Sequence, residues 1–287
     1  MQTTQLEKAK RFHELHTAEG CFLMPNAWDA GSAKMLATAG FSAIATTSAG
    51  VAFSMGHPDH GFCSADARVD RNNMLARVES MASAVAVPLN ADLEAGYGVS
   101  PEAVAETITK TIAAGAAGGN IEDFTGDKSH PLFETQLAVD RIRAAREAVN
   151  RSGMPFVLTA RADCYLVGHA DAFAESVRRA NLFREAGADC LFVPGVSDAD
   201  TIGRLVKEID GPINIVMGLT GNALSLADLK ALGVRRISIG GSLARAMYYH
   251  IQQAAREMIE QGTFSYADKQ VPQWELNQIF GDSSEPY

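Results

Sequence analysis

The chain alternates between short apolar runs and longer segments in which apolar residues recur every three or four positions. Short runs are typical of buried strands, and the longer periodicity is typical of helices with one buried face. We expect eight strands, at residues 22–28, 41–47, 87–92, 118–121, 155–160, 190–193, 212–216 and 236–239. A helix is expected after each strand, at residues 29–39, 70–84, from 100, 134–150, 170–186, from 197, 225–232 and from 240. Eight such units predict a (β/α)8 barrel with parallel, buried strands.

A helix at residues 4–18 is expected to precede the barrel and to pack against it. Its apolar positions follow helical spacing: Leu6, Ala9, Phe12 and Leu15. We assign residues 1–261, this helix and the barrel, to a single domain. Residues 262–287 form a C-terminal extension that we expect to be irregular, and apolar enough to pack on the barrel or on a neighbouring subunit. Residues 48–61 are expected to be a long functional loop.

Composition narrows the function classes. The formal charge is −9 and there is no basic run, which argues against nucleic acid and anionic membranes as partners. The N-terminal segment lacks the apolar stretch of a signal peptide, and no apolar run reaches membrane-spanning length. The cysteines are widely spaced, which favours free thiols in a reducing compartment and predicts a cytoplasmic protein: Cys21, Cys63, Cys164 and Cys190.

Two carboxylates follow the apolar run at residues 87–92. Side chains alternate across a strand, so Asn90, Asp92 and Glu94 share one face. Carboxylates held close together repel one another unless a cation lies between them, and clustered oxygens favour Mg²⁺ or Mn²⁺ over soft metals. The pair therefore indicates a hard-metal site, although carboxylates that merely face solvent beside a turn would give the same pattern.

Other polar residues stand at the ends of the predicted strands, where barrel enzymes place their active sites. They are Asn26, Asp29, Ser48, Asp59, Asp92, Glu94, Glu122, Asp123, Arg161, Asp163 and Asn214. The acidic members can supply oxygens to Mg²⁺, and the Arg161 fork suits a substrate carboxylate or phosphonate. Ser48 and Gly50 can donate to an anion, and Asn214 can orient a second carboxylate. Arg161 has a second interpretation, as a structural partner of Asp163 or Asp189.

These motifs together resemble the isocitrate lyase/phosphoenolpyruvate mutase superfamily over nearly the whole chain. The matching segments are Pro25-Asn26-Ala27-Trp28-Asp29, Thr47-Ser48-Ala49-Gly50-Val51-Ala52, Gly56-His57-Pro58-Asp59, Asp92-Leu93-Glu94-Ala95-Gly96-Tyr97-Gly98, Asn120-Ile121-Glu122-Asp123, Ala160-Arg161-Ala162-Asp163 and Asn214-Ile215-Val216. The resemblance implies a barrel whose last helix is exchanged between subunits of a dimer or tetramer. It also implies that Mg²⁺, or alternatively Mn²⁺, binds with a 2-oxo or 2-hydroxy acid.

The resemblance also implies roles for individual residues. Asp92 would ligate the metal directly, and Asp59, Glu94 and Glu122 would hold its water ligands. The acid groups of the substrate would bind to Arg161 and to the segment Ser48, Ala49 and Gly50, and Asn214 would line the pocket. The candidate catalytic residues are Asp59, Glu122, Lys128, His130 and Arg161.

One departure from the family pattern concerns catalysis. Isocitrate and methylisocitrate lyases carry a catalytic cysteine on the loop after the fourth strand, whereas residues 124–132 of this chain contain none. Phosphoenolpyruvate mutases and phosphonopyruvate hydrolases also lack this cysteine, and Lys128 and His130 are candidates for the parts that polar loop residues play in them. A serine hydroxyl does not replace a thiol in proton transfer without a neighbouring base.

We therefore expect a Mg²⁺-dependent enzyme of the cysteine-less branch that acts on a small 2-oxo or 2-hydroxy acid through a pyruvate-like enolate. Cleavage of a C–C bond by a lyase or decarboxylase is favoured by the Asn26-Ala27-Trp28-Asp29 and Gly50-Val51-Ala52 segments. One alternative is an enzyme that acts on a C–P bond, as a mutase or a phosphonopyruvate hydrolase does. A second alternative is a protein that binds oxo acids without catalysis.

Overall fold

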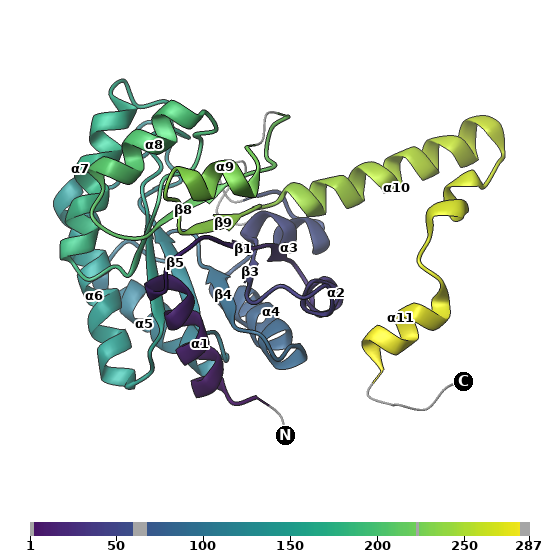
Figure 1. Ribbon diagram of the computed structural model, residues 1–287, viewed down its shortest axis with the longest axis horizontal. Coiled ribbons are helices and arrows are strands. Elements are labelled where there is room, and N and C mark those ends of the chain that lie inside the picture. Colours follow the sequence, from purple (N-terminus) through teal and green to yellow (C-terminus); the bar gives the residue numbers. More distant parts are fainter. Residues whose placement is uncertain (1–2, 60–67, 222–223, 282–287) are drawn as a thin grey trace.

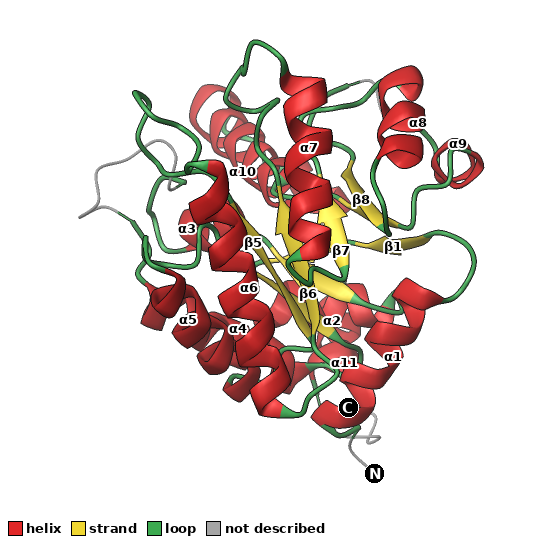
Figure 2. Ribbon diagram, turned by 90° about the vertical axis from the view of Figure 1, so that its left-hand side faces the viewer, coloured by secondary structure: helices red, strands yellow, loops and turns green. Residues whose placement is uncertain are grey.

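The computed structural model describes residues 3–59, 68–221 and 224–281, and its centre is a nine-stranded parallel sheet surrounded by helices (Figure 1, Figure 2). The strand order is β1-β9-β8-β7-β6-β5-β4-β3-β2. The strands are β1 (Phe22–Met24), β2 (Asn26–Ala27), β3 (Ile44–Thr46), β4 (Leu89–Asp92), β5 (Gly118–Glu122), β6 (Val157–Arg161), β7 (Cys190–Phe192), β8 (Ile213–Val216) and β9 (Arg236–Ser238).

The sheet closes nearly completely into a barrel at β1 and β2. These two strands are one extended segment interrupted at Pro25, which has no backbone N–H to donate. β1 pairs with β9 and β2 pairs with β3, so this segment joins the two edges of the sheet. The Asn26 side chain strengthens the closure because its amide donates to the Thr46 carbonyl and its oxygen accepts from the backbone of Ile239 and Gly240. The predicted (β/α)8 barrel is thereby confirmed.

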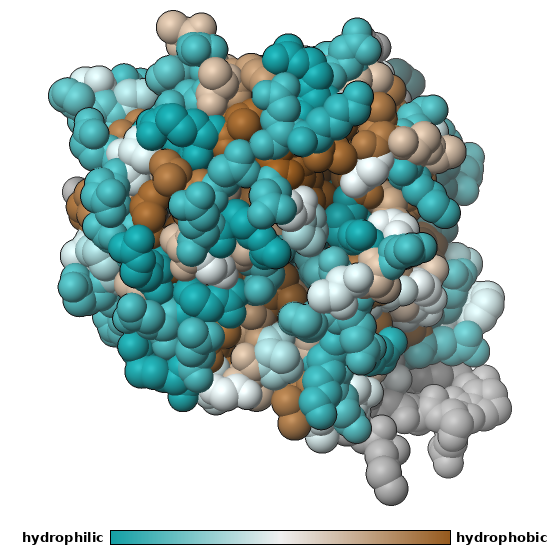
Figure 3. Space-filling model, turned by 60° about the vertical axis from the view of Figure 1, so that its left-hand side comes forward, coloured by the Kyte–Doolittle hydropathy of each residue, from teal (hydrophilic) through white to brown (hydrophobic). Residues whose placement is uncertain are grey.

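Apart from α3 and α11, the helices lie where the sequence periodicity predicts them, within a few residues at each end. They are α1 (Gln5–Thr17), α2 (Ala30–Thr38), α3 (Ser48–Ser54), α4 (Arg71–Ala84), α5 (Pro101–Ala113), α6 (Thr135–Ser152), α7 (Ala172–Glu185), α8 (Ala199–Glu208), α9 (Leu226–Ala231), α10 (Ser242–Gln261) and α11 (Gln273–Phe280). Polar side chains cap many of their N-termini, including Asp29, Asp70, Ser100 and Ser225. The outward side of the barrel helices is largely hydrophilic (Figure 3).

Two elements differ from the sequence-based expectation. The expected loop after β3 begins with the short helix α3, because the Thr47 hydroxyl accepts from the Gly50 N–H and starts a helical turn. The C-terminal extension, expected to be irregular, contains a 3-10 turn at Ser265–Lys269 and the helix α11. Cys63, one of the predicted free thiols, and the end of the expected loop at residues 60–61 lie outside the described residues.

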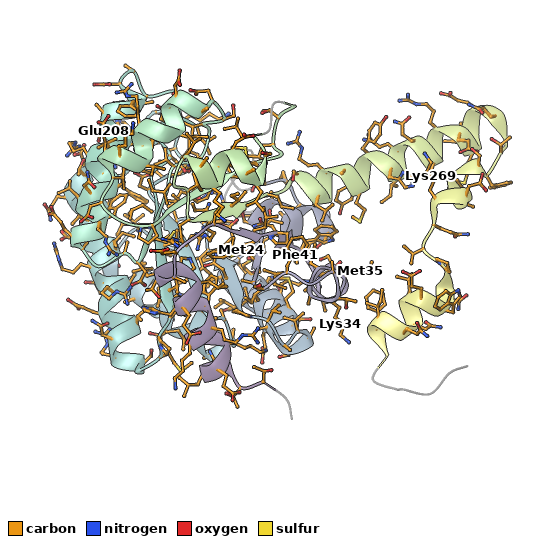
Figure 4. All side chains as sticks on the ribbon, in the orientation of Figure 1. Met24, Lys34, Met35, Phe41, Glu208 and Lys269 are labelled. Carbon is orange, nitrogen blue, oxygen red and sulfur yellow. The ribbon has the colours of Figure 1, made fainter. Side chains whose placement is uncertain are left out.

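The helix α10 stands away from the barrel, and the chain then returns so that α11 lies near α2 (Figure 1). The ammonium of Lys34, on α2, donates to the Phe280 carbonyl over 3.1 Å (Figure 4). Ala244 is the one buried residue of α10. The exposed apolar side chains of α10 and the segment after it include Met247, Tyr249, Ile251, Met258, Ile259, Phe264 and Trp274. Within the described ranges, no helix has the length and apolar character needed to cross a membrane.

The N-terminal helix α1 closes the end of the barrel opposite the strand C-termini. Phe12 is fully buried in a cluster with barrel residues such as Met24, Ala45 and Val157. A Cβ on Gly118 would come within 2.5 Å of the Phe12 ring, so the absence of a side chain on β5 lets the helix dock closely. The Lys8 ammonium donates to the last carbonyls of the neighbouring helix α4, at Ala82 and Val85.

His16 connects this helix to the barrel interior. Its Nε2 lies 3.1 Å from Nη1 of Arg236 and its Nδ1 lies 2.7 Å from the Phe12 carbonyl oxygen. A guanidinium can only donate, so Nε2 accepts and Nδ1 carries the proton that bonds Phe12. Burial, together with the nearby charge of Arg236, lowers the pKa of His16 from 6.5 to about 3.

We expect His16 to make the fold sensitive to acid. The imidazole takes up a proton in the unfolded chain below its ordinary pKa but not in the folded protein, so stability is lost as the pH falls below about 6.5. Between about pH 7.5 and about pH 5 this group alone should lower the free energy of unfolding by about 2 kcal/mol. Urea unfolding at the two pH values measures the loss. His16→Gln should reduce it, whereas His13→Gln, at an exposed position of the same helix, should not. An unchanged loss in His16→Gln would contradict the assignment.

Candidate active site

A cavity of about 590 Å³ opens at the carboxyl ends of the barrel strands. Its polar lining is drawn from six strands and the loops that follow them, which agrees with the position of active sites in barrels of this type. The polar lining residues are Asn26, Thr47, Ser48, Asp59, Asn90, Asp92, Asn120, Arg161, Asn214, Arg236, Ser238 and Arg245. Met24, at the centre of Figure 4, and Phe192 are among the apolar side chains of the same cavity.

Asp92 is a carboxylate of the cavity that several hydrogen bonds hold in place. It is the last residue of β4, and its backbone N–H donates to the Thr46 hydroxyl on β3. Its Oδ2 accepts from both the backbone N–H and the hydroxyl of Ser48, over 2.9 and 2.8 Å, at the start of α3. Its Oδ1 accepts from the amide of Asn120, on β5, over 2.8 Å. Three donors therefore fix the carboxylate, and Oδ1 keeps a lone pair for a further ligand.

The donor set of the cavity fits a hard divalent cation. Asp92 and Asp59 supply carboxylates and Ser48 supplies a hydroxyl oxygen, and no cysteine or histidine is among the described lining residues. Mg²⁺ keeps several water ligands and binds through one or two carboxylates, so it does not need a complete cage of protein ligands. This matches the described chain, in which no three His, Cys, Asp or Glu side chains are grouped closely enough to hold an ion by themselves.

The other two predicted metal residues lie beside the cavity and not in its lining. Glu94 lines a second cavity of about 490 Å³, together with Arg68 and Tyr97. Glu94 and Tyr97 both have positive φ, at 51° and 57°, which is a strained conformation for residues other than glycine. Arg141, on α6, maintains this loop because its guanidinium donates to the carbonyls of residues 95, 98 and 99.

Arg161 reaches the cavity from the end of β6 and is bound by two carboxylates. Its Nε and Nη2 donate to the two oxygens of Asp163, over 2.5 and 2.9 Å, and its Nη1 lies 2.9 Å from Oε2 of Glu122. Burial by itself would lower the pKa of Arg161, but the two carboxylates raise it above its usual range, so the guanidinium stays charged. The pairing with Asp163 that the sequence left open is present, and two N–H hydrogens remain for a ligand.

A second layer of charges supports this pair. Oδ1 of Asp123, which follows β5, accepts from the backbone N–H of Asp163, and its Oδ2 lies 3.1 Å from Nη1 of Arg179, on α7. Burial raises the pKa of Asp123 to about 6, against the opposing effects of that N–H and of Arg179. The Asp163 carboxylate, which is 3% exposed, is thus held in position by its own backbone as well as by Arg161.

Asn214 and Arg236 form the deeper part of the cavity, on the neighbouring strands β8 and β9. Nε of Arg236 donates to Oδ1 of Asn214 over 2.8 Å, and Nδ2 of Asn214 donates to the Ser238 hydroxyl over 3.0 Å. Nη2 of Arg236 donates to the Thr159 hydroxyl over 3.0 Å. The functional interpretation of the sequence missed Arg236, although a charged residue at the start of an apolar strand in a barrel was a signal that could have found it.

Comparison with known proteins places this site in a family. The family described as phosphoenolpyruvate phosphomutase matches residues 12–259. The 2-methylisocitrate lyase of Escherichia coli K12 is 31% identical over 71% of this chain and 68% of its own length. The chain belongs to the isocitrate lyase/phosphoenolpyruvate mutase superfamily.

Two further proteins are similar to this superfamily member. The 2,3-dimethylmalate lyase of Eubacterium barkeri is 28% identical over 79% of this chain and 78% of its own length. A crystal structure from Burkholderia cenocepacia J2315, of a protein whose activity is given only as lyase or mutase, is 45% identical. It superimposes with a TM-score of 0.91 over 96% of both chains. Proteins similar to this chain therefore include lyases and mutases that act on small acids.

The loop that carries the catalytic cysteine in some superfamily members contains no cysteine in this chain. Residues 124–132 form a short loop whose two ends are joined by an antiparallel β-bridge between Phe124 and Leu132. Lys128 and His130 are exposed on it, outside the lining of the large cavity, and His130 lies 3.6 Å from Asp127. Of the described cysteines, Cys164 is fully buried and burial raises its pKa to about 11, so it is a structural thiol.

Proposed function

We propose that this superfamily member is a Mg²⁺-dependent carbon–carbon lyase or decarboxylase that acts on a small 2-oxo or 2-hydroxy acid. The observation that carries the proposal is the position of Asp92, which Ser48 and Asn120 hold at one wall of a cavity that Arg161 enters from the opposite side of β5. A fixed carboxylate beside a fixed guanidinium suits the joint binding of a divalent cation and a carboxylate. The relatives that are named as lyases of branched hydroxy acids support this choice.

Each residue has a defined part in the proposed reaction. Asp92 would be the direct metal ligand, and Asp59, Glu94 and Glu122 would hold its water ligands. When bound, Mg²⁺ would supply positive charge that stabilises the oxyanion of a pyruvate-like enolate relative to the keto form of the substrate. Arg161 binds the substrate carboxylate with its two remaining N–H groups, and Ser48 and Ala49 line the wall beside it. The rigid cavity holds the acid planar, which is the geometry in which an enolate is stabilised.

The proton must be moved by a group other than a cysteine. Asp59 is the proposed acid or base because it lines the cavity and is a titratable carboxylate. Lys128 and His130 stay candidates only if the loop at residues 124–132 moves towards the cavity when substrate binds. Single substitutions at Asp59 and at His130 separate the two possibilities, because the residue that moves the proton should alter the pH profile of kcat.

The test is pyruvate release with Mg²⁺ from oxaloacetate, alkyl malates, methylisocitrate and phosphonopyruvate. We expect turnover of at least one carbon acid, and loss of that turnover after treatment with EDTA, restored by Mg²⁺ or Mn²⁺. Product formed from phosphonopyruvate alone would instead assign the protein to C–P chemistry. Activity that survives complete removal of divalent metal would disprove the metal role. Ligand-induced thermal stabilisation without turnover of any acid would favour a binding protein.

We also propose that α10 packs against the barrel of a second copy in a homo-oligomer. The helix stands clear of its own barrel and exposes apolar side chains along its length, including Tyr249, Ile251 and Ile259. Monomeric proteins seldom leave so many large apolar groups in water. Light scattering should find a dimer or tetramer, and a monomer at micromolar concentration would contradict the proposal.

A further inference from the structure

The charges around the cavity are unevenly compensated. One guanidinium group, at Arg236, is buried there, a second, at Arg161, is half-buried, and a third, at Arg245, is exposed at the rim. Arg161 contacts the carboxyl groups of both Asp163 and Glu122, so its positive charge is already offset by its own partners. Arg161 therefore offers directed hydrogen bonds to a ligand but little net positive potential.

Arg236 is in the opposite situation. It is 1% exposed, and its side chain donates hydrogen bonds to Asn214, Thr159 and His16, which are all neutral acceptors. Within residues 3–59, 68–221 and 224–281 no carboxylate forms an ion pair with it. His16 is the neutral imidazole, so it does not contribute a charge that could offset that of Arg236. A charged group buried without a counter-charge is costly, so the positive potential of Arg236 is available to whatever enters the cavity.

Arg236 also decides which atoms of Asn214 face the ligand. Because Nε of Arg236 can only donate, the Asn214 oxygen must point to it, and the Asn214 amide must point to Ser238 and the cavity. Asn214 thus presents an N–H donor, and not a carbonyl oxygen, to the contents of the cavity. A donor and a buried positive charge at the same wall both favour an anionic group on the ligand.

We propose that Arg236 is the residue that makes this cavity select doubly negative ligands over singly negative ligands of the same shape. The second negative charge would be the second carboxylate of a dicarboxylic substrate or the oxyanion of an enolate. The inference rests on the proposed function only in assuming that small carboxylic acids enter this cavity. It assigns the charge preference to Arg236, in addition to any contribution from a metal ion, because Arg161 is already neutralised.

Oxalate and pyruvate are suitable probes, since the two planar anions have the same number of heavy atoms and differ by one negative charge. We would measure both dissociation constants by calorimetry near pH 8 with Mg²⁺ in every titration. The oxalate concentration would be corrected for the part that Mg²⁺ complexes in solution. In Arg236→Met the affinity for oxalate should fall by about tenfold to a hundredfold, a range expected for one buried charge several ångströms away. The affinity for pyruvate should fall by less than about threefold, so the ratio of the two constants is the measurement.

Two further variants separate charge from folding. Arg236→Lys keeps the charge but not the fork, so it should retain most of the preference for oxalate even where Asn214 is less well oriented. Arg235→Met removes a charge from the neighbouring position, whose side chain does not line the cavity, and should leave both affinities unchanged. Circular dichroism and the urea midpoint establish that each variant is folded.

The outcomes are distinguishable from failure of the proposed function. An equal loss of oxalate and pyruvate affinity in Arg236→Met, or no loss of either, would overturn the role of Arg236 even if the enzyme releases pyruvate. If Arg236→Met does not fold, a folded Arg236→Lys that has lost the preference for oxalate overturns it as well. If the unmodified protein binds neither anion, the cavity is not a site for small acids, and both the inference and the proposed function fail.

Discussion

Asp92→Asn is expected to lower kcat/KM for pyruvate release by about a thousandfold or more. The substitution removes the charge that would attract a divalent cation, and a loss of about 4 kcal/mol of transition-state stabilisation corresponds to that factor. The change also disturbs the hydrogen bonds of the site. Three donors from Ser48 and Asn120 converge on the Asp92 carboxylate, so an amide must place its own N–H₂ against a donor.

Two measurements make this prediction specific. Calorimetric titration with Mn²⁺ should show that Asp92→Asn binds the metal at least tenfold more weakly than the unmodified protein. Asp210→Asn is the matched control, because Asp210 is an exposed aspartate before β8, at the opposite end of the barrel. Its kinetics and metal affinity should be unchanged. Activity of Asp92→Asn within tenfold of the unmodified protein would show that Asp92 is not the metal ligand.

Arg161→Lys is expected to lower kcat/KM by about a hundredfold although the positive charge is retained. The Arg161 fork bonds both oxygens of Asp163 through Nε and Nη2 and reaches Glu122 through Nη1, which leaves two N–H groups for substrate. A lysine ammonium has three donors and no fixed plane, so it cannot satisfy two buried carboxylates and also hold a substrate carboxylate in a fixed orientation. Most of the effect should appear as an increase in KM.

Arg178→Lys is the matched control, since Arg178 pairs with Glu175 on the exposed side of α7 and lies outside the cavity. It should leave both kcat and KM unchanged. An Arg161→Lys variant with normal KM and reduced thermal stability would show that Arg161 is a structural partner of Asp163 and does not bind substrate. That result would also increase the relative importance of Arg236 as a cation of the cavity.

The sequence alone determined the architecture and the end of the barrel at which the site lies. Alternation of short apolar runs with helical periodicity is a local property, and caps such as Ser100 and Asp70 fix helix starts through bonds to residues three positions away. Parallel strands bring their carboxyl ends to one rim, so the location of Asp92 and Arg161 followed from strand order. The motifs around them also sufficed to identify the superfamily, which the comparisons confirmed.

The sequence did not reveal which of these side chains neutralise one another. The donors that hold Asp92 come from Ser48 and Asn120, which are 44 and 28 positions away in the chain. Glu122 meets Arg161 because β5 and β6 align these residues in register, and Arg236 meets His16 across 220 positions. The first residue of the helix α3, which was expected to be a loop, is also held by a distant partner, because Ser48 donates to Asp92.

The physical reason is the range of the interactions. Secondary structure follows from hydrophobic periodicity and from hydrogen bonds a few residues apart, and these can be read along the chain. Whether a buried charge has a counter-charge depends on strand register, on loop geometry and on the helix that closes the barrel, and all three are set only when distant segments pack together. The sequence therefore determined at which end of the barrel the candidate site lies, and the tertiary structure decided that Arg161 is neutralised while Arg236 is not.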